Sequence, residues 1–212
     1  MATAPRSERR AERRSAILEA ADAILDPEMY ELPSAAEIAA KAGIAKGTVY
    51  LYFKTKEEIY LALLGRGYTQ CAEYMMEDLS GGWLRLEEFL GRYISFCLAN
   101  PKTMTLACMG PVLLERNSGE KLAFAFRRDL ATSTREVAEM VAVTLPPLGV
   151  EDARRLLLQT LVLSAGLWQQ AFPPVNLRQV YAHEDVKAIQ TDFKQDLYGA
   201  LEALWKSSRG RR

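Results

Sequence analysis

The segment at residues 34–56, SAAEIAAKAGIAKGTVYLYFKTK, constrains the fold more than any other part of this 212-residue chain. Ser34 and Glu37 have the spacing of a capping box, in which each side chain accepts a hydrogen bond from the other residue's backbone amide at a helix start. Apolar residues then recur at helical spacing as far as Ala42. Gly43 follows, and glycine readily adopts the left-handed conformation that ends a helix. The pattern predicts a short helix closed by a tight turn.

A second short helix is expected at residues 46–53, directly after this turn. Thr55 and Glu58 repeat the capping-box spacing and mark the start of a third helix. Two short helices joined by a glycine turn form a helix-turn-helix, whose second helix can enter the major groove of DNA. The segment therefore predicts a DNA-reading unit.

The net charge of the whole chain argues against DNA binding. Its 27 basic and 27 acidic residues cancel, whereas nucleic-acid-binding domains usually carry a basic excess. The charges are segregated, however. Residues 38–56 contain four lysines and no acid, and residues 1–14 contain five arginines against two glutamates. An arginine-rich start is by itself equally typical of a solvated tail. Beside a helix-turn-helix, we expect it to contact phosphates, since one basic face suffices to attract DNA.

The remaining composition argues against several classes of protein. The three cysteines, Cys71, Cys97 and Cys108, lack metal-site spacing, and we expect them to be small buried groups in a reducing cytoplasm. A single histidine, His183, argues against a metal site or a histidine-based catalytic triad. No apolar run approaches the roughly 20 residues that span a membrane, and no apolar block follows the arginines as in a secretory signal. We therefore expect a cytoplasmic protein without a cofactor, a membrane contact or an enzymatic activity.

Helical periodicity extends over the whole chain, and no segment alternates as a strand would. The pattern predicts an all-α fold of about nine helices, at residues 7–25, 35–42, 46–53, 56–79, 83–99, 118–145, 151–172 and 185–206, with a short broken helix within 102–115. Gly65 and Gly67 each weaken a helix by up to about 1 kcal/mol relative to alanine. We therefore expect a bend near the middle of the helix at 56–79.

With these residues in view, the chain resembles the TetR family of bacterial transcriptional regulators. The resemblance covers about residues 10–60 and is carried by ILEAA at 17–21, EIA at 37–39, AGIAKGTVY at 42–50, YF at 52–53 and KEE at 56–58. The rest of the chain matches only as a helical region of suitable length. The resemblance implies a three-helix DNA-binding domain at residues 1–56 and a helical effector-binding and dimerisation domain at residues 57–212.

Six residues are implied by their motif positions to face DNA: Lys46, Gly47, Thr48, Tyr50, Tyr52 and Lys56. A lysine at the start of the recognition helix can reach a guanine edge or a phosphate, and a glycine lets the backbone approach. The hydroxyl groups can donate to phosphates, and Lys56 is placed to meet one. Val49 and Phe53 are assigned to the core of the domain.

Three departures from the family pattern are visible. Ala45 stands where serine or threonine is common, so the recognition helix is expected to lack a side-chain cap worth about 1 kcal/mol. Leu51 offers only an apolar contact, such as one to a thymine methyl group. The segment at 26–30 lacks the glycine that usually precedes its tyrosine, so the turn after the first helix is expected to differ locally.

Bulky side chains are frequent after residue 80. Each of these side chains, taken alone, is best explained as part of a helical core. Together, however, they permit an apolar pocket with a few polar anchors. We expect an uncharged or weakly anionic hydrophobic effector. The candidate lining residues are Tyr93, Phe96, Met109, Phe126, Arg127, Trp168 and Gln169, with Arg128 as a further polar anchor.

A helix-turn-helix that reads a palindrome is expected to work as a dimer. The apolar faces of the helices at 151–172 and 185–206 are the best candidates for a four-helix interface, although one subunit can equally cover them itself. The leading hypothesis is a ligand-responsive repressor that binds palindromic operator DNA as a homodimer and is released by a small hydrophobic effector. One alternative is a DNA-binding protein of the same fold without an effector, controlled by a protein partner or acting architecturally. Another is a helical enzyme with a DNA-binding head, against which the lack of clustered catalytic residue types counts.

Overall fold

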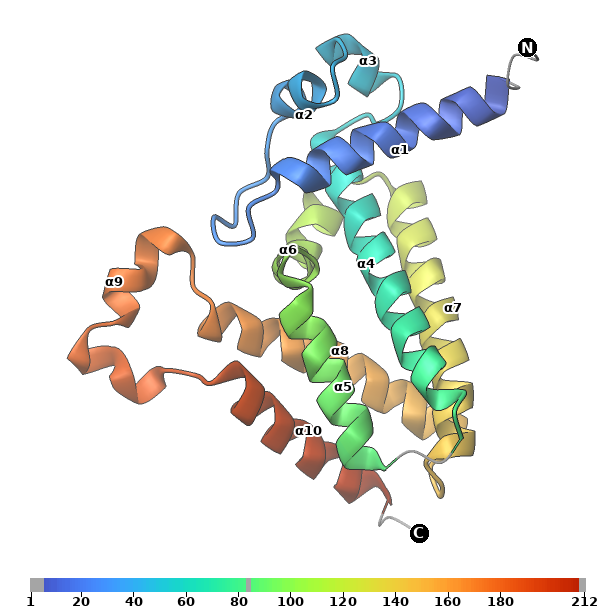
Figure 1. The fold of residues 1–212 in the computed structure, drawn as a ribbon, viewed down its shortest axis with the longest axis vertical. Coiled ribbons are helices and arrows are strands. Elements are labelled where there is room, and N and C mark those ends of the chain that lie inside the picture. Colours follow the sequence, from blue (N-terminus) through green and yellow to red (C-terminus); the bar gives the residue numbers. More distant parts are fainter. Residues whose placement is uncertain (1–5, 83–84, 210–212) are drawn as a thin grey trace.

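The structure, a computed structural model, describes residues 6–82 and 85–209. These residues form ten α-helices and two short 3-10 turns, with no strand among them. Three helices lie at one end of an elongated molecule, and the first and last of the described helices start and finish at opposite ends of it (Figure 1). None of the described helices is long and apolar enough to cross a membrane.

The three N-terminal helices form the part that we call the reading head: α1 Arg6–Ile24, α2 Ala35–Lys41 and α3 Lys46–Tyr50. Their apolar faces meet in a first core, in which Ile17, Ile38 and Val49 are buried. The next helix, α4 Lys56–Leu79, contributes Ile59 and Leu64 to the same core before it runs into the rest of the molecule. The reading head is therefore joined to the remainder by a helix that belongs to both.

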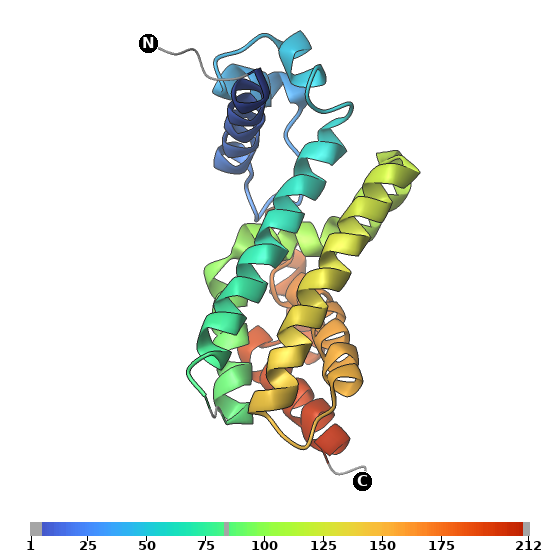
Figure 2. The same ribbon diagram turned by 90° about the vertical axis from the view of Figure 1, so that its right-hand side faces the viewer.

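Five longer helices build the rest of the molecule: α5 Leu86–Ala99, α6 Pro101–Asn117, α7 Glu120–Thr144, α8 Val150–Ala171 and α10 Phe193–Arg209. They enclose a second core around Phe89, Val141, Leu156 and Trp205. Figure 2 shows α4 and α7 running side by side along the length of this bundle. The second half of α4 thus forms one wall of the bundle.

Several expected helix bounds differ from those observed. The helix expected at 46–53 ends at Tyr50, because Leu51 to Phe53 form a turn that buries the Phe53 ring in the first core. The expected start of the fifth helix, Trp83, lies outside the described residues. The last helix begins at Phe193 rather than at 185, and the residues before it form separate short elements.

The break expected near Gly110 is wrong, since α6 runs uninterrupted from Pro101 to Asn117. Gly110 is buried against α4, where an added Cβ would stand 3.5 Å from Leu64 Cδ2. Tertiary packing of this kind routinely outweighs the low helix propensity of glycine. In the same way, Gly65 and Gly67 do not interrupt α4.

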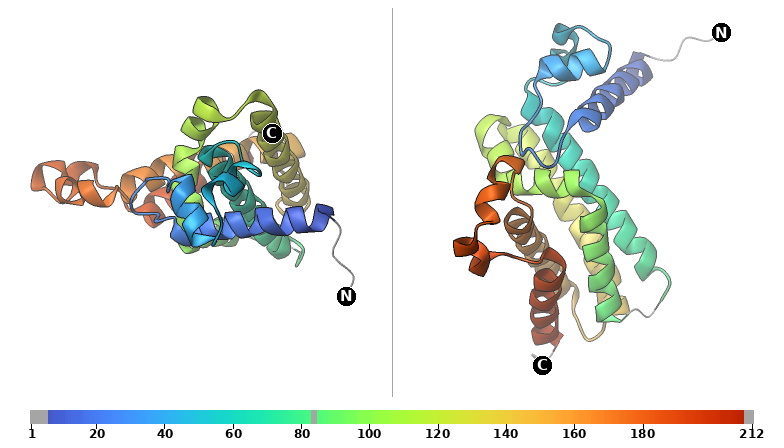
Figure 3. Two further views of the ribbon diagram at one scale, coloured as in Figure 1. Left: turned by 90° about the horizontal axis from the view of Figure 1, so that it is seen from above. Right: turned by 60° about the vertical axis from the view of Figure 1, so that its left-hand side comes forward.

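Residues 172–192 leave the bundle between α8 and α10 and contain a 3-10 turn at Val175–Leu177, α9 Arg178–Tyr181 and a 3-10 turn at Glu184–Ile189. Seen from above in Figure 3, they form the part that projects farthest from the body. Helical periodicity gave no sign of these short elements, which have no buried residues.

Candidate functional site

The helix-turn-helix is built by local interactions that the sequence predicts. Glu37 N donates to Ser34 Oγ at 3.3 Å and Ser34 N donates to Glu37 Oε2 at 2.8 Å, which confirms the capping box at the start of α2. Gly43 has φ +65° and closes α2. The start of α3 at Ala45 has no side-chain cap, as expected. The turn between α2 and α3 is therefore fixed by one residue that needs a left-handed conformation.

The second capping-box pattern is realised in a modified form. Glu58 N donates to Thr55 Oγ1 at 3.3 Å, as the pattern predicts, but Glu58 Oε2 accepts from Lys54 N at 2.7 Å rather than from the Thr55 amide. The carboxylate thereby anchors the turn after α3 to the first turn of α4.

The outer face of α3 carries most of the residues implied to face DNA. Lys46, Gly47 and Tyr50 are exposed, and Thr48 is half-buried. An added Cβ on Gly47 would meet no atom within 4 Å, so the backbone there is open to close approach. Leu51 follows with 73% of its surface exposed. Val49 and Phe53 are buried, which confirms their assignment to the core.

Two of the six residues implied to face DNA, Tyr52 and Lys56, also contact other parts of the protein. Tyr52 is half-buried beside the first core. Lys56 is also half-buried, and its Nζ donates to the backbone carbonyl of Leu32 at 3.2 Å, just before α2. An ammonium group has three donors, so this hydrogen bond leaves donors for a phosphate while it ties α4 to the entrance of α2.

A basic groove lies beside the end of α3, lined by Arg9, Arg10 and Arg13 of α1 together with Leu51 and Tyr52. The arginine-rich start is thus part of a helix rather than a tail. Arg14, the next arginine, lies over the Phe53 ring with its guanidinium carbon 4.8 Å from the ring centroid. The side chain of Arg6 lies outside the described residues. Three guanidinium groups without an acid in the lining produce the local positive field that the neutral composition conceals.

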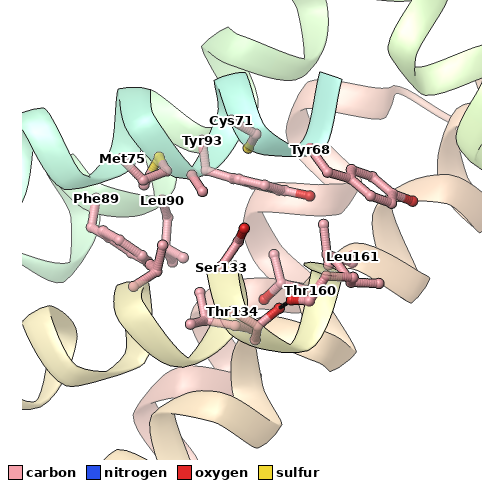
Figure 4. Close-up of a pocket in the computed structure, with 14 residues that line it drawn as sticks. Tyr68, Cys71, Met75, Phe89, Leu90, Tyr93, Ser133, Thr134, Thr160 and Leu161 are labelled. Carbon is pink, nitrogen blue, oxygen red and sulfur yellow. Dashed lines mark hydrogen bonds between the residues drawn. The ribbon is translucent and has the colours of Figure 1, made fainter. Parts of the chain in front are cut away.

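A second site lies inside the bundle, which we call the inner cavity. It has a volume of only about 60 Å³ and lies between α4, α5, α7 and α8. Figure 4 shows Tyr68, Cys71 and Met75 of α4 facing Ser133 and Thr134 of α7 across it. The lining is predominantly apolar and includes no charged side chain.

The ionisable groups of this lining are neutral near physiological pH. Burial raises the pKa of Tyr68 to about 12. Burial also raises the pKa of the Cys71 thiol and that of Tyr93 well above their ordinary values. The cavity therefore favours an uncharged occupant or the uncharged part of a larger one.

A chain of hydrogen bonds connects the cavity wall to α10. Tyr93 donates to Ser164 Oγ at 3.0 Å, and Ser164 donates to the carbonyl of Thr160 at 2.6 Å. Trp205 of α10 in turn donates to Thr160 Oγ1 at 3.0 Å. Thr160 and Ser164 were not among the predicted lining residues, because the candidates were chosen as bulky side chains with a few larger polar anchors. Their spacing of four on the inward face of an apolar helix is the signal that identifies them.

The structure does not bring the seven predicted lining residues together. Tyr93 alone among them lines the inner cavity. Phe96 is buried and packs on Tyr74 with ring centroids 5.6 Å apart, and Met109 packs against the first core. Trp168 is buried at the far end of α8, where it stacks on Phe172.

The other three predicted residues, Phe126, Arg127 and Gln169, line a separate outer hollow between α6, α7 and α8. Tyr68, Leu130 and Leu161 line both the outer hollow and the inner cavity. The outer hollow thus adjoins the inner cavity and adds an exposed guanidinium to its neutral lining. Arg128 is ion-paired with its neighbour Asp129 at 2.9 Å instead.

Comparison with known proteins covers nearly the whole described chain. Residues 17–63 match the family described as bacterial regulatory proteins, tetR family, and residues 68–209 match the tetracyclin repressor-like C-terminal domain. The fatty acid metabolism regulator protein of Bacillus subtilis (strain 168) is 40% identical over 63 residues. That match spans 30% of this chain and 32% of the relative's length.

Two solved structures share the fold over almost their full length. The transcriptional regulator FadR from Bacillus subtilis, in complex with stearoyl-CoA, superposes with a TM-score of 0.53 at 21% identity, covering 92% of this chain and 97% of that one. The fatty acid degradation regulator FadR from Bacillus halodurans gives 0.53 at 20% identity, covering 89% and 94%. At these identities the likeness shows a common fold.

Proposed function

The chain belongs to the TetR family of bacterial transcriptional regulators, and from this membership we propose that it is a repressor that binds palindromic operator DNA as a homodimer. We further propose that a molecule with a long apolar chain, of the fatty acyl-CoA class, widens the inner cavity as it enters and so releases the protein from DNA. The observation that carries the proposal is a neutral apolar cavity one wall of which is the helix that leaves the reading head.

The DNA-binding part of the proposal rests on the outer face of α3 and the basic groove beside it. Lys46, Tyr50 and Leu51 are exposed on or directly after α3, where side chains can reach base edges and phosphates. The arginines of α1 lie next to them, as a second set of phosphate contacts requires. Lys46, Gly47, Thr48, Tyr50, Tyr52 and Lys56 remain our proposed contact residues.

The dimer part of the proposal rests on α8 and α10, which pack against each other. Val162 on α8 has 76% of its surface exposed, and Gly166 one turn later leaves open space for a partner helix, which would then cover part of the outer hollow that both residues line. Two recognition helices must lie about 34–36 Å apart to enter successive major grooves. If α8 and α10 pair symmetrically with the same helices of a second copy, the two recognition helices of the dimer are held at one fixed distance from each other.

The effector part of the proposal rests on the division between the neutral inner cavity and the outer hollow. The uncharged lining of the inner cavity suits an acyl chain chemically, but α4, α5, α7 and α8 must move apart to admit one, because the cavity measures about 60 Å³. A polar or anionic head then lies toward Arg127 and Gln169 in the outer hollow. The similar fold of FadR from Bacillus subtilis in complex with stearoyl-CoA makes this the first ligand class to test.

In this proposal, the ligand releases the protein from DNA by shifting the population between two conformations of the protein. A ligand that binds one arrangement of α4 and α8 more tightly than another favours that arrangement. If the favoured arrangement changes the separation of the recognition helices, operator affinity falls by the same coupling free energy.

The test is selection of bound DNA from a random pool, repeated with and without stearoyl-CoA. We expect a palindromic sequence to be enriched without the ligand and to be depleted with it. Enrichment of no sequence contradicts the DNA-binding proposal. Enrichment that is equal with stearoyl-CoA, with free fatty acid and without ligand contradicts the effector class.

A further inference from the structure

The turn between α1 and α2 is held by the chain segment that leaves α8, about 145 residues away along the sequence. Tyr30 OH donates to the carbonyl of Phe172 at 3.1 Å. The amide of Val175 donates to the carbonyl of Glu28 at 3.0 Å, and Arg178 Nη2 lies 2.8 Å from Glu28 Oε1. We call these three contacts the clasp.

The conformation of the held turn depends on residues outside the reading head. Tyr30 has φ +53°, a left-handed conformation that is costly for a residue with a side chain. Its ring packs against the second core, whereas α1 to α3 belong to the first. Thr105 of α6 also donates to the carbonyl of Pro27 at 2.9 Å. The C-terminal bundle therefore imposes the shape of the turn that leads into α2.

The other end of the clasp is fixed to α8. The Phe172 ring stacks on Trp168 with centroids 4.2 Å apart, and both contact Phe193 at the start of α10. Phe172 thus joins the aromatic packing at the end of α8 through its ring and the reading head through its carbonyl. About three turns before Phe172, Thr160 and Leu161 of the same helix line the inner cavity.

We propose that the clasp positions the reading head, so that a displacement of α8 by an occupant of the inner cavity reaches α2 through Glu28 and Tyr30. This route is separate from direct transmission of a displacement along α4. Its effect on DNA binding rests on the proposed function. Glu28, Tyr30 and Arg178 are positioning residues, because they touch neither the cavity nor the outer face of α3. The Arg178–Glu28 pair is exposed, and exposed pairs add little stability. Its loss is therefore expected to change coupling while the fold is retained.

The variant that tests the clasp is Arg178→Glu, which places two carboxylates together at Glu28. The double exchange Glu28→Arg with Arg178→Glu restores an ion pair of opposite direction. Arg135→Glu is the matched control, because Arg135 forms an equally short exposed pair with Glu139 on α7 at 2.9 Å. The measured quantity is the ratio of operator dissociation constants with and without stearoyl-CoA, alongside the dissociation constant of stearoyl-CoA itself.

We expect Arg178→Glu to reduce that ratio by at least about threefold while stearoyl-CoA affinity stays within about twofold of wild type. The double exchange is expected to restore the ratio, and Arg135→Glu to leave it unchanged. An undiminished ratio in Arg178→Glu, or a ratio that the double exchange does not restore, overturns the proposal.

Amide hydrogen exchange supplies a measurement that needs neither DNA nor effector. We expect Arg178→Glu to accelerate exchange at the Val175 amide and in α2, with α5 unchanged. If the wild-type protein binds no DNA, the proposed function fails. Amide exchange in α2 then tests by itself whether the clasp positions the reading head. Unaltered exchange in α2 then overturns it, and accelerated exchange supports it.

Discussion

Gly67 of α4 and Thr103 of α6 lie so close that a Cβ added to Gly67 would stand 2.5 Å from both Oγ1 and Cγ2 of Thr103. The two helices therefore cross at a point where α4 can carry no side chain. Because α4 joins the reading head to the wall of the inner cavity, this crossing fixes the helix at an intermediate point. The absence of a side chain at Gly67 allows this close packing.

Gly67→Ala is expected to destabilise the protein. Overpacking of this kind costs about 1–3 kcal/mol, which outweighs a gain of up to about 1 kcal/mol in helix propensity. Gly91→Ala on α5 is the control, since an added Cβ there meets no atom within 4 Å. Urea unfolding should show opposite signs for the two variants, and equal signs would contradict the packing role.

Lys46→Ala is expected to weaken operator binding by about 1–3 kcal/mol and to relax preference at one base pair, because the side chain is exposed at the start of α3. Arg135→Ala, which removes an exposed basic side chain from α7, should leave binding unchanged. Fluorescence anisotropy with the selected operator and single-base variants measures both effects. If Lys46→Ala alters neither affinity nor preference, α3 does not lie in the groove as proposed.

The basic groove is expected to contribute phosphate contacts that do not depend on sequence. Replacing Arg9, Arg10 and Arg13 together by alanine should lower the slope of log affinity against log salt by up to about 0.9 for each arginine. Affinity should fall by a similar factor for operator and random DNA. A salt titration checks the slope, with Arg135→Ala as the control, and an unchanged slope excludes these arginines from the interface.

Ser133→Phe is expected to abolish stearoyl-CoA binding while operator binding persists, because Ser133 projects into the inner cavity (Figure 4). At a ligand concentration of 100 times its dissociation constant, the wild type should gain about 2.7 kcal/mol of stability. The variant should gain none in the same thermal-shift measurement. Ser95→Phe, at an exposed position on α5, should respond like the wild type. Equal stabilisation of both variants would place the ligand elsewhere.

Alkaline pH is expected to destabilise the protein through Cys97. Burial raises the pKa of its thiol from 9.0 to about 12, so the folded state retains a proton that the unfolded state releases between these values. The stability from this group is present below pH 9 and is lost as the pH rises toward 12. One pKa unit corresponds to about 1.4 kcal/mol, so unfolding at pH 10 should cost about that much less than at pH 8. Cys97→Ala should show a correspondingly smaller change in urea unfolding.

The sequence was sufficient wherever the determining interaction is local. Ser34 and Glu37 are three residues apart and Gly43 acts through its own backbone, so the turn of the helix-turn-helix was predictable in detail. Tyr30 shows the limit of this approach. A missing glycine indicated a different turn, but the Phe172 carbonyl that Tyr30 OH contacts is 142 residues away.

The cavity was less predictable because bulky apolar residues fill a core as readily as they line a pocket. Phe96 was expected to line the pocket but is buried against Tyr74, and Trp168 lines a different hollow, beside Phe172 at the end of α8. Space was left instead where small polar residues such as Ser133 and Thr160 face inward. Such gaps depend on the relative placement of four helices, and no single helix specifies that placement.

An inner cavity without a charged wall has a consequence for what the proposed regulator reports. An occupant gains affinity from the apolar surface it buries, about 0.8 kcal/mol or about fourfold for each methylene group, but only as far as the helices around the cavity of about 60 Å³ move apart to admit it. The hydroxyl groups of the lining, such as those of Ser133 and Thr134, distinguish occupants only by hydrogen bonding and not by charge. The proposed response therefore weights the chains present by their abundance and by how much of their length the widened cavity admits.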